Sequence, residues 1–305
     1  MIQNISIENF RCFDKTEIKG FSRMNLITGK NNSGKTCLLE ALYFCLSQDF
    51  MNTLKIRYDE GEWKQDDYLV NDVNNGTIRF RFSTDGNELG FYFTPLPATF
   101  TDFKTHDNFV SQNDVQLLGS TNEKSFNYHN LVHLFDQAQI GGFDNEVLEA
   151  VKLIDNTISE IRTFASFPNT LFLKKTDSSK YQPIHYYGDA TKKIILYVGV
   201  ILNFRKHEYK YLLIDEIENG IHYTAQKEVW QMLFKLCQHF DIQLFATTHS
   251  HEMITAFEEV CEEFEGEGAY FEMARHAKTN QIIGIKHEIA TLEYELETNT
   301  AIRGE

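Results

Sequence analysis

Residues 29–36 have the types and spacing needed to hold a chain of phosphates. They match the pattern G-x-x-x-x-G-K-T at every defined position. The two glycines allow a tight turn in which backbone N–H groups point inward at phosphate oxygens. Lys35 would supply a positive charge to the β- and γ-phosphates of ATP, and Thr36 would offer its hydroxyl to Mg²⁺. The residues that we expect to contact the nucleotide are Gly29, Asn31, Asn32, Ser33, Gly34, Lys35, Thr36 and Cys37.

The segments on either side of this loop fit a phosphate site. Residues 23–28 are expected to form a strand that enters the loop, and residues 36–46 a helix whose many apolar residues indicate burial. A helix that begins at the phosphates adds the positive end of its dipole to the site. The sequence therefore predicts a strand, a phosphate loop and a buried helix in succession.

Two adjacent carboxylates far downstream could complete the site. Asp215 and Glu216 follow a short apolar run at residues 212–214, which is typical of a parallel strand buried on both faces. Because α/β sheets bind ligands at the carboxyl ends of their strands, both side chains are expected to face the phosphates. Asp215 is then the expected Mg²⁺ ligand, through a water molecule, and Glu216 the expected base that orients or activates the attacking water.

A second polar strand end follows along the chain. Residues 243–248 are expected to form a strand that ends at His249 and Ser250. A histidine by itself is more often a satisfied core residue, but its place at the end of the next strand favours a role beside the two carboxylates. Apolar residues between the two strands recur at helical spacing, so this segment is predicted to be a β–α–β unit. These residues are Ala225, Val229, Met232, Leu233, Leu236 and Phe240.

In five stretches the chain resembles the ABC-type ATPase heads of the SMC, RecF and OLD proteins, a class that includes AAA-family ATPases of bacterial defence loci. Residues 5–13 are similar to the I-x-I-x-N-F-R-x-F opening of these heads, and residues 187–193 are similar to their signature motif. The phosphate loop corresponds to Walker A. Residues 214–222 resemble the extended Walker B motif and D-loop, and residues 246–250 resemble the switch region.

The resemblance implies an ATPase that works as a homodimer or a higher homo-oligomer. Each ATP would lie between the Walker A loop of one subunit and the signature motif of the other. Gly188, Asp189 and Thr191 would act there through backbone amides at the start of a helix. His249 would sense the γ-phosphate and take part in catalysis together with Lys35 and Glu216. Arg11 would reach the nucleotide from the N-terminal strands; the alternative is a surface arginine that does not contact phosphate.

Two residues of the signature motif depart from the class. Ala190 stands where relatives usually have a second glycine, and Tyr187 replaces a small polar residue. The Cβ atom of Ala190, which a glycine lacks, would hinder close approach to a γ-phosphate across the interface. We therefore keep open an ATP-gated scaffold with little turnover.

The middle of the chain has weaker patterns. Residues 77–94 alternate and are aromatic around Asp85 and Gly86, which predicts a β-hairpin in an antiparallel sheet that flanks the core. Residues 100–130 are polar and are expected to form a loop. Residues 144–165 carry apolar side chains at three- and four-residue steps, which predicts a helix.

Together these elements predict an α/β fold, an ABC-type P-loop ATPase head with a mixed central sheet. Residues 1–50 and 181–305 would form the ATPase core, and residues 51–180 a flanking antiparallel sheet and an inserted α/β lobe. The insertion has no sustained heptads, so we expect no long coiled coil. No Toprim-like, HNH or PD-ExK pattern is found, so we expect no fused nuclease domain.

Composition narrows the expected partners and location. The net charge of −15 argues against a broad surface for nucleic acid, which needs clustered Lys and Arg, although a basic groove in a dimer stays open. No apolar run reaches about 18 residues, so no membrane-spanning helix is expected. The five cysteines show no C-x-x-C spacing, which together with the lack of a signal pattern predicts a cytoplasmic protein with reduced thiols.

Three functions compete at this stage. The first is an ATP-binding and hydrolysing module that dimerises around ATP and gates a separate effector protein, possibly a nuclease, in antiviral defence; the defence role rests on the resemblance alone. The second is a RecF-like ATPase of DNA repair or maintenance, which the low count of Lys and Arg disfavours. The third is the ATP-gated scaffold with little turnover.

Overall fold

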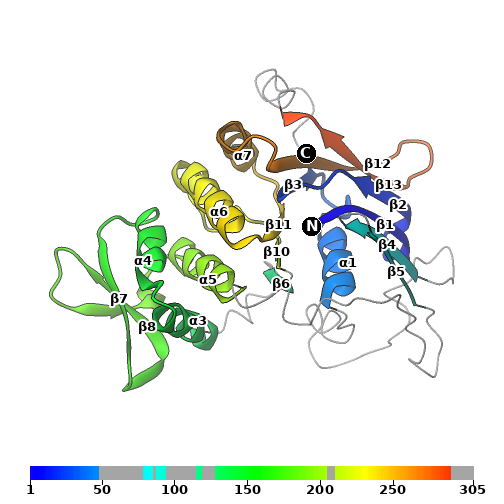
Figure 1. The fold of residues 1–305 in the computed structure, drawn as a ribbon. Coiled ribbons are helices and arrows are strands. Elements are labelled where there is room, and N and C mark those ends of the chain that lie inside the picture. The colour runs from blue at the N-terminus through cyan, green and yellow to red at the C-terminus, as the bar shows by residue number, and fades with distance from the viewer. Residues whose placement is uncertain (48–77, 85–86, 94–114, 119–127, 205–209, 290–305) are drawn as a thin grey trace.

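The described part of the chain forms three β-sheets with helices packed around them (Figure 1). The computed structural model describes residues 1–47, 78–84, 87–93, 115–118, 128–204 and 210–289. The largest sheet is mixed, because five of its strands are parallel and one edge strand is antiparallel. In spatial order its strands are β13 (Ile282–His287), β12 (Gly268–Arg275), β3 (Met24–Gly29), β11 (Gln243–Thr247), β10 (Tyr211–Ile214) and β6 (Val115–Leu118). The expected α/β fold with a mixed central sheet is confirmed.

Alternate residues of the central strands face two separate apolar cores. Leu212 and Ile214 of β10 lie in one core, whereas Tyr211 and Leu213 lie in the other. Successive side chains of a strand point to opposite faces, so a strand covered on both faces needs an unbroken apolar run. This is the physical reason for the short apolar run before the two carboxylates.

Helices cover both faces of the central sheet (Figure 1). Helix α1 (Lys35–Ser47) lies on one face, and α5 (Asp189–Asn203), α6 (Gln226–Phe240) and α7 (His251–Glu263) lie on the other. The β–α–β unit predicted from sequence is formed by β10, α6 and β11, and its two strands pair in parallel. The carboxyl ends of β3, β10 and β11 therefore lie side by side at the same end of the sheet.

A second, antiparallel sheet covers α1 from outside. Its strands lie in the order β2 (Phe13–Lys19), β1 (Ile2–Phe10), β4 (Ile78–Thr84) and β5 (Asn87–Phe93). The predicted hairpin is confirmed, since β4 and β5 pair antiparallel. The apolar residues of β1, β2 and β4 share one core with α1, which fixes the β1–β2 turn beside the start of that helix.

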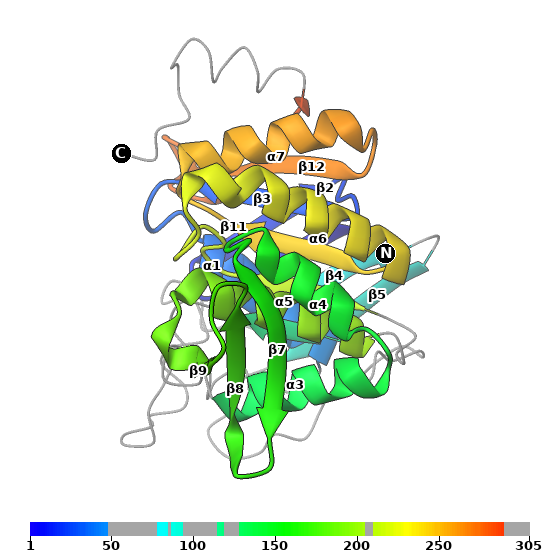
Figure 2. The same cartoon turned by 90° about the vertical axis from the view of Figure 1, so that its left-hand side faces the viewer.

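The remaining described elements form a lobe beside α5, seen face-on in Figure 2. They are α3 (Tyr128–Ile140), α4 (Asp144–Lys152), β7 (Ile158–Phe164), β8 (Phe167–Lys175) and β9 (Tyr181–Pro183). The three strands form an antiparallel sheet in the order β7, β8, β9. The lobe packs on the head through α3 and α4, which both contact α5.

Helices α3 and α5 pack tightly at Gly199. A methyl group at this position would lie 2.8 Å from Cβ of Leu134 in α3. Real Cβ atoms do not sit so close to a neighbour, so the glycine is needed for this contact. Glycine lowers helix propensity by about 1 kcal/mol, and here the close packing of the two helices offsets that cost.

Two predictions for the middle of the chain were wrong in part. The helix predicted over residues 144–165 ends at Lys152, and β7 follows. Ile158 and Ile161 are three apart, as on a helix face, but a shift in register between Ile158 and Glu160 turns both toward the core of a strand. Thr157 donates both its N–H and its hydroxyl to Asp155, which closes the turn between helix and strand.

The predicted loop over residues 100–130 contains a strand and the start of a helix. Strand β6 joins the central sheet beside β10, although its residues fall in the range predicted to form the flanking sheet and lobe. Four residues between polar segments are too short to show a period, and the partner strand lies far along the chain. The rest of that loop prediction, residues 100–114 and 119–127, lies outside the described residues.

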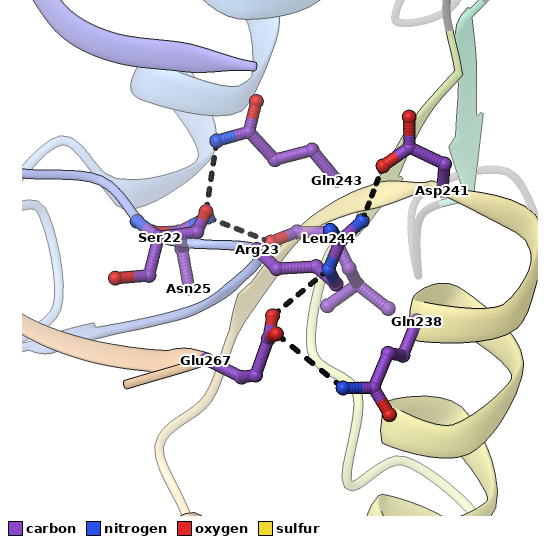
Figure 3. Close-up of polar contacts among 8 residues, drawn as sticks. All are labelled: Ser22, Arg23, Asn25, Gln238, Asp241, Gln243, Leu244 and Glu267. Carbon is purple, nitrogen blue, oxygen red and sulfur yellow. Dashed lines mark hydrogen bonds and ion pairs between the residues drawn. The ribbon is translucent and has the colours of Figure 1, made fainter. Parts of the chain in front are cut away.

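The end of the central sheet opposite the phosphate loop is tied to the N-terminal strand by a buried amide. The side chain of Gln243 donates to the carbonyl oxygen of Ile2 (2.7 Å) and accepts from the N–H of Ile2 (2.7 Å). It also donates to the carbonyl oxygen of Ser22 at 2.8 Å (Figure 3). Gln243 is 1% exposed, and its two hydrogen bonds to Ile2 are buried, so they satisfy groups that water cannot reach. The amide thereby joins the two large sheets.

An arginine stabilises the same end of the sheet. Arg23 contacts Asp241, which follows α6, at 2.7 Å, and Glu267, which precedes β12, at 2.8 Å (Figure 3). The hydrogen bond from Arg23 lowers the pKa of Asp241. Through these two ion pairs Arg23 connects the start of β3, the end of α6 and the start of β12. The strand that carries the phosphate loop is therefore held in place at its other end.

Candidate nucleotide-binding site

Two glycines shape the phosphate loop between β3 and α1. Gly29 has a φ of 135° and Gly34 a φ of 93°, values in the region that disfavours any residue with a Cβ atom. A methyl group on Gly29 would also lie 2.2 Å from the carbonyl oxygen of Met273 and 2.7 Å from Oγ of Ser33. The glycines are therefore required both by backbone conformation and by space.

Lys35 lies folded over the loop and faces the downstream carboxylates. Its Nζ donates to the carbonyl oxygens of the first two loop residues, at 2.7 and 3.0 Å. Burial lowers the pKa of Lys35 to about 8, against the opposing effect of the negative charges of Asp215, Glu218 and Glu216. The two motifs are thus brought together, and a lysine bonded to carbonyl oxygens is available to a stronger, anionic acceptor.

The loop also holds a buried hydroxyl that fits a phosphate ligand. Ser33 is 3% exposed, and within the described residues its Oγ has no hydrogen-bond partner. Buried hydroxyls are rarely left unsatisfied, so an oxygen of a bound phosphate is a suitable partner. Asn31 and Asn32 are exposed at the tip of the loop, and Cys37 is half-buried in the first turn of α1.

Thr36 and Asp215 form the pair that could hold Mg²⁺. The hydroxyl of Thr36 lies 3.4 Å from Oδ1 of Asp215. The hydroxyl of Thr247, at the end of β11, donates to the same Oδ1 atom and accepts from the N–H of Glu216 at 2.9 Å. Hard oxygen donors held at such spacing suit Mg²⁺. Thr247 therefore fixes the carboxylate of Asp215 and the backbone of Glu216 from the neighbouring strand.

Glu216 is held in an unusual backbone conformation. Its φ is 52°, in the left-handed region that non-glycine residues seldom adopt. The amide of Asn219 donates to Oε2 of Glu216 at 2.6 Å. Strained residues of this kind persist only where surrounding contacts enforce them, and they concentrate at functional sites. Asn219 therefore positions the predicted base.

Glu218 connects the D-loop to the switch region. Its carboxylate accepts from the hydroxyl of Thr248 at 2.7 Å and from the backbone N–H of His249 at 2.8 Å. The side chain of His249 itself is exposed at the end of β11. Ser250 then caps α7 by accepting from the N–H of Met253 at 3.2 Å. The backbone of His249 is thus held by Glu218 on one side and by the capped start of α7 on the other, while its exposed ring can reach a ligand.

Sequence reasoning missed three residues that the structure brings to the site: Thr247, Glu218 and Asn219. Each is a polar residue inside a stretch that was recognised, but no role in the site was predicted for it. The available signal was the run of polar residues after two apolar strands, but sequence alone does not say which of these side chains bond to one another.

The signature segment lies at the start of α5. Gly188 and Asp189 are exposed, and space is open around the α-carbon of Gly188. Thr191 is 3% exposed, and Ala190 is buried in the apolar core. The methyl group of Ala190 therefore does not lie on the surface where it was expected to hinder a phosphate. Gly220 of the D-loop lies against this segment, since a methyl group there would be 3.2 Å from Cβ of Asp189.

Tyr187, the other departure from the signature pattern, also has a structural explanation. Its hydroxyl donates to the carbonyl oxygen of Leu173 in β8 at 3.3 Å. Burial raises the pKa of Tyr187, which keeps the hydroxyl a donor. The tyrosine thereby attaches the lobe sheet to the start of α5.

Arg11 is not a surface residue. Its side chain is 8% exposed and forms an ion pair with Glu40 of α1 at 2.7 Å. Its guanidinium also lies 5.6 Å from the ring centre of Phe10. Contact between Arg11 and a nucleotide would require this ion pair to open or to be shared.

Within the described residues, no hydrogen bond or ion pair joins residues 188–191 to residues 29–36. No described helix is long and apolar enough to cross a bilayer. Within one copy of the chain, the phosphate loop and the start of α5 are therefore separate surfaces.

Known proteins are similar to this chain in sequence. An ATP/GTP phosphatase of Helicobacter pylori is 25% identical over 342 aligned positions, which cover 86% of this chain and 89% of that protein. The DNA replication and repair protein RecF of Chloroherpeton thalassium is 32% identical over 100 residues, or 31% of this chain and 27% of that protein. The chain thus spans about a quarter of the length of that RecF relative.

Solved structures share the fold. The SMC head domain from Thermotoga maritima has a TM-score of 0.57 at 12% identity, with 94% of this chain and 99% of that chain covered. An Smc head bound to the C-winged helix domain of ScpA has a TM-score of 0.62 at 11% identity, with 95% and 99% covered. At such identities the similarity shows the fold alone, and it agrees with the ABC-type head expected from sequence.

A family model decides the class of the chain. The model described as AAA domain, putative AbiEii toxin, Type IV TA system matches residues 24–254, a span that runs from β3 through the switch region. This span contains the phosphate loop, the signature segment and both carboxylates of the Walker B motif. The chain therefore belongs to this AAA-domain family and is an ATPase head of the ABC type.

Proposed function

We propose that this domain hydrolyses ATP between two copies of itself and that its nucleotide state controls a separate effector protein. The observation that carries the proposal is the meeting of Thr36 and Asp215, which are 179 positions apart in the chain. Glu216 lies close enough to Lys35 for its negative charge to act against the burial that lowers the pKa of the Lys35 ammonium group. Phosphate binding, metal binding and activation of water are thereby assigned to one edge of the sheet.

Each residue has a distinct chemical part in the proposed reaction. Lys35 exchanges its two loop carbonyls for oxygens of the β- and γ-phosphates. Thr36 and Asp215 hold Mg²⁺, Asp215 through a water molecule, and bound Mg²⁺ would neutralise charge on the phosphates. Glu216, oriented by Asn219, accepts a hydrogen bond from the attacking water. His249 contacts the γ-phosphate while its backbone stays bonded to Glu218.

The second copy supplies the signature segment. Gly188 and Asp189 are exposed at the start of a helix of 15 residues, where N–H groups favour an anion. Thr191 is buried one turn further on and supports this helix start from inside. ATP would then close the dimer, and hydrolysis would open it. Because Ala190 points into the core, the structure offers less support for the scaffold without turnover than the sequence did.

The link to antiviral defence rests on the family. Its description names a putative AbiEii toxin and a Type IV toxin–antitoxin system. The described lobe is an extra surface attached to the start of α5, which suits a partner protein that responds to the ATP state. The cytoplasmic location is part of this proposal, in keeping with cysteines that are thiols.

A RecF-like role in DNA repair or maintenance is the second candidate. The short matches to RecF proteins favour it, such as 41% identity over 44 residues with the protein of Clostridium acetobutylicum. The net charge of −15 opposes it, since backbone contacts to DNA need positive charge. DNA-stimulated hydrolysis that falls steeply with salt would favour this candidate over effector control.

The test compares Glu216→Gln, Lys35→Ala and Gly188→Glu with Glu262→Gln, a control at an exposed position of α7. With Mg²⁺ and ATP, Glu216→Gln should bind nucleotide, turn over slowly and accumulate as a dimer in light scattering. Lys35→Ala should not bind, and Gly188→Glu should bind without dimer-dependent turnover. A second protein that copurifies only with the trapped dimer would support effector control; a Glu216→Gln variant with normal turnover would refute the assignment of the base.

A further inference from the structure

The hairpin of β12 and β13 borders the phosphate loop, because β12 is the neighbour of β3 in the central sheet (Figure 1). Strands β12 and β3 pair in parallel, and Met273 lies opposite Gly29, the first residue of the loop. A methyl group on Gly34 would lie 3.0 Å from Cδ1 of Ile282, the first residue of β13. The hairpin therefore contacts the loop near both of its ends, although it lies beyond residues 24–254, which the family model matches.

Arg275, the last residue of β12, connects this hairpin to the tip of the loop. Its Nη2 donates to the carbonyl oxygen of Asn32 at 3.2 Å, and its Nη1 donates to that of Asn280 at 3.3 Å. Asn280 lies in the turn between β12 and β13, which is closed by backbone hydrogen bonds between His276 and Gln281 and between Asn280 and His276. The guanidinium is therefore held on its own hairpin while it bonds the loop.

The carbonyl group that Arg275 holds belongs to a peptide unit whose N–H lies inside the loop. In a trans peptide the C=O and N–H groups point in opposite directions, and the described residues contain no cis bond. Because the carbonyl of Asn32 points at Arg275, the N–H of Ser33 points away from it, and this N–H donates to the carbonyl oxygen of Lys30 at 3.2 Å. The same carbonyl of Lys30 accepts from Nζ of Lys35 at 3.0 Å. The N–H of Ser33 thus points to the side of the loop where Lys35 would meet phosphate.

The backbone of Asn32 needs support to keep this orientation. Its φ is 61°, in the left-handed region, which disfavours residues with a Cβ atom, although asparagine tolerates it better than most. Asn32 is also exposed to water at the loop tip. A return to the common right-handed region would rotate the Asn32–Ser33 peptide and turn its N–H away from the phosphates. The bond from Arg275 opposes that rotation, and the guanidinium stays charged up to about pH 12.

We propose that Arg275 is a positioning residue of the ATPase, which orients the Asn32–Ser33 peptide so that its N–H faces the phosphates before ATP binds. The inference rests on the proposed placement of ATP at residues 29–36. Arg275 acts on the nucleotide through Asn32, so its loss disorders the loop in the free protein. The cost then falls on binding, and the chemical step at Glu216 proceeds unchanged once the phosphates are in place.

The first measurement follows hydrogen exchange of the loop without nucleotide. Arg275→Ala is compared with Lys278→Ala, which removes a positive charge from an exposed position of the same turn. We expect the backbone N–H of Ser33 to exchange faster in Arg275→Ala than in wild type, and at the wild-type rate in Lys278→Ala. Arg275→Lys keeps one donor for the carbonyl of Asn32 and should fall between the two, and it decides the test if Arg275→Ala does not fold. Equal exchange in the wild type and in the Arg275 variants would overturn the proposal.

The second measurement is steady-state hydrolysis of ATP. Arg275→Ala should raise KM about fivefold, the low end of the factor by which the left-handed conformation disfavours a residue with a Cβ atom. The value of kcat should stay within about twofold, because the chemical step is untouched. Lys278→Ala should change neither constant. A fall in kcat with an unchanged KM would contradict a role in positioning the loop.

Glycine in place of Asn32 separates positioning from direct contact. Asn32→Gly frees the loop from the cost of the left-handed conformation, because glycine adopts it readily. In this background Arg275→Ala should raise KM by less than about twofold. A rise of about fivefold in both backgrounds would show instead that Arg275 contacts the phosphates directly, and the positioning role would be wrong. Wild-type protein that neither binds nor hydrolyses ATP would refute the proposed function, while hydrogen exchange would still test the orientation of the loop.

Discussion

Replacement of Glu218 by Gln should separate ATP binding from hydrolysis. The wild-type carboxylate accepts two hydrogen bonds, one from the N–H of His249 and one from the hydroxyl of Thr248. A glutamine of the same shape keeps one acceptor oxygen and replaces the other by an NH₂ group, which cannot accept. One charge-assisted bond to the switch region is then lost, while the phosphate loop is untouched.

The size of the effect follows from that lost bond. A hydrogen bond to a charged group contributes about 1.5–3 kcal/mol, which corresponds to a factor of about 10–100 in the fraction of protein whose switch region is ordered. If catalysis needs that order, the rate of a single turnover of ATP should fall by this factor. The affinity for ATP should stay the same when it is measured well below pH 8, where Lys35 is protonated, because Lys35 and Thr36 keep their positions.

Single-turnover hydrolysis of radiolabelled ATP, with protein in excess, measures this rate directly. Glu262→Gln makes the same chemical change at an exposed position of α7 and should leave the rate unaltered. A rate for Glu218→Gln equal to that of Glu262→Gln would refute the coupling of the D-loop to the switch region. A loss of ATP affinity in proportion to the rate would show instead that Glu218 acts on binding.

Three further outcomes are expected. Gln243→Leu removes three hydrogen bonds, of which the two to Ile2 are buried, and should lower the free energy of unfolding in urea by about 3–6 kcal/mol, whereas Gln238→Leu at the surface should change it by less than about 0.5 kcal/mol. The folded protein without nucleotide loses the Lys35 proton as pH rises through about 8, whereas the unfolded chain keeps it up to 10.5. Between these two pH values unfolding takes up a proton, so Lys35 makes the free energy of unfolding rise with pH. ATP binding should therefore weaken above pH 8 and show proton uptake in calorimetry with buffers of different ionisation enthalpy, and a constant affinity across this range would contradict the buried lysine. Gly34→Ala places a methyl group at φ 93° and should abolish ATP binding while the fold survives by circular dichroism; normal binding would show that the loop relaxes.

The site could be predicted from sequence where chemistry demands a fixed residue type. Only glycine tolerates the conformation of Gly29 and Gly34, and only an unbroken apolar run suits β10 between two cores. Such requirements leave a pattern along the chain. The ATP-contacting roles of Arg11, Gly188 and Asp189 remain predictions, because they concern a ligand and a second copy.

The features that sequence did not predict depend on contacts between distant elements. Strand β6 is four residues long and acquires its identity from pairing with β10. Thr247 fixes Asp215 from the neighbouring strand, and nothing in the local sequence distinguishes it from any other threonine. The helix predicted over residues 144–165 failed because a β-bulge imitates helical spacing. The spacing of apolar residues indicates which of them are buried, but a helix and a strand with a β-bulge can bury residues at the same spacing.

The close contact between Gly199 and Leu134 means that a movement of α5 would also move the lobe. The helix begins at the exposed signature segment and runs for 15 residues, or about 22 Å, with the lobe packed along it. Under the proposed function the helix would act as a lever, with its first turn at the nucleotide and the lobe attached along its length. A rotation too small to alter the central sheet would be magnified at the strands of the lobe, since a stiff rod converts a small angle into a large displacement. Substitution of Gly199 by a larger residue would loosen the joint, so that the lobe would no longer follow the head.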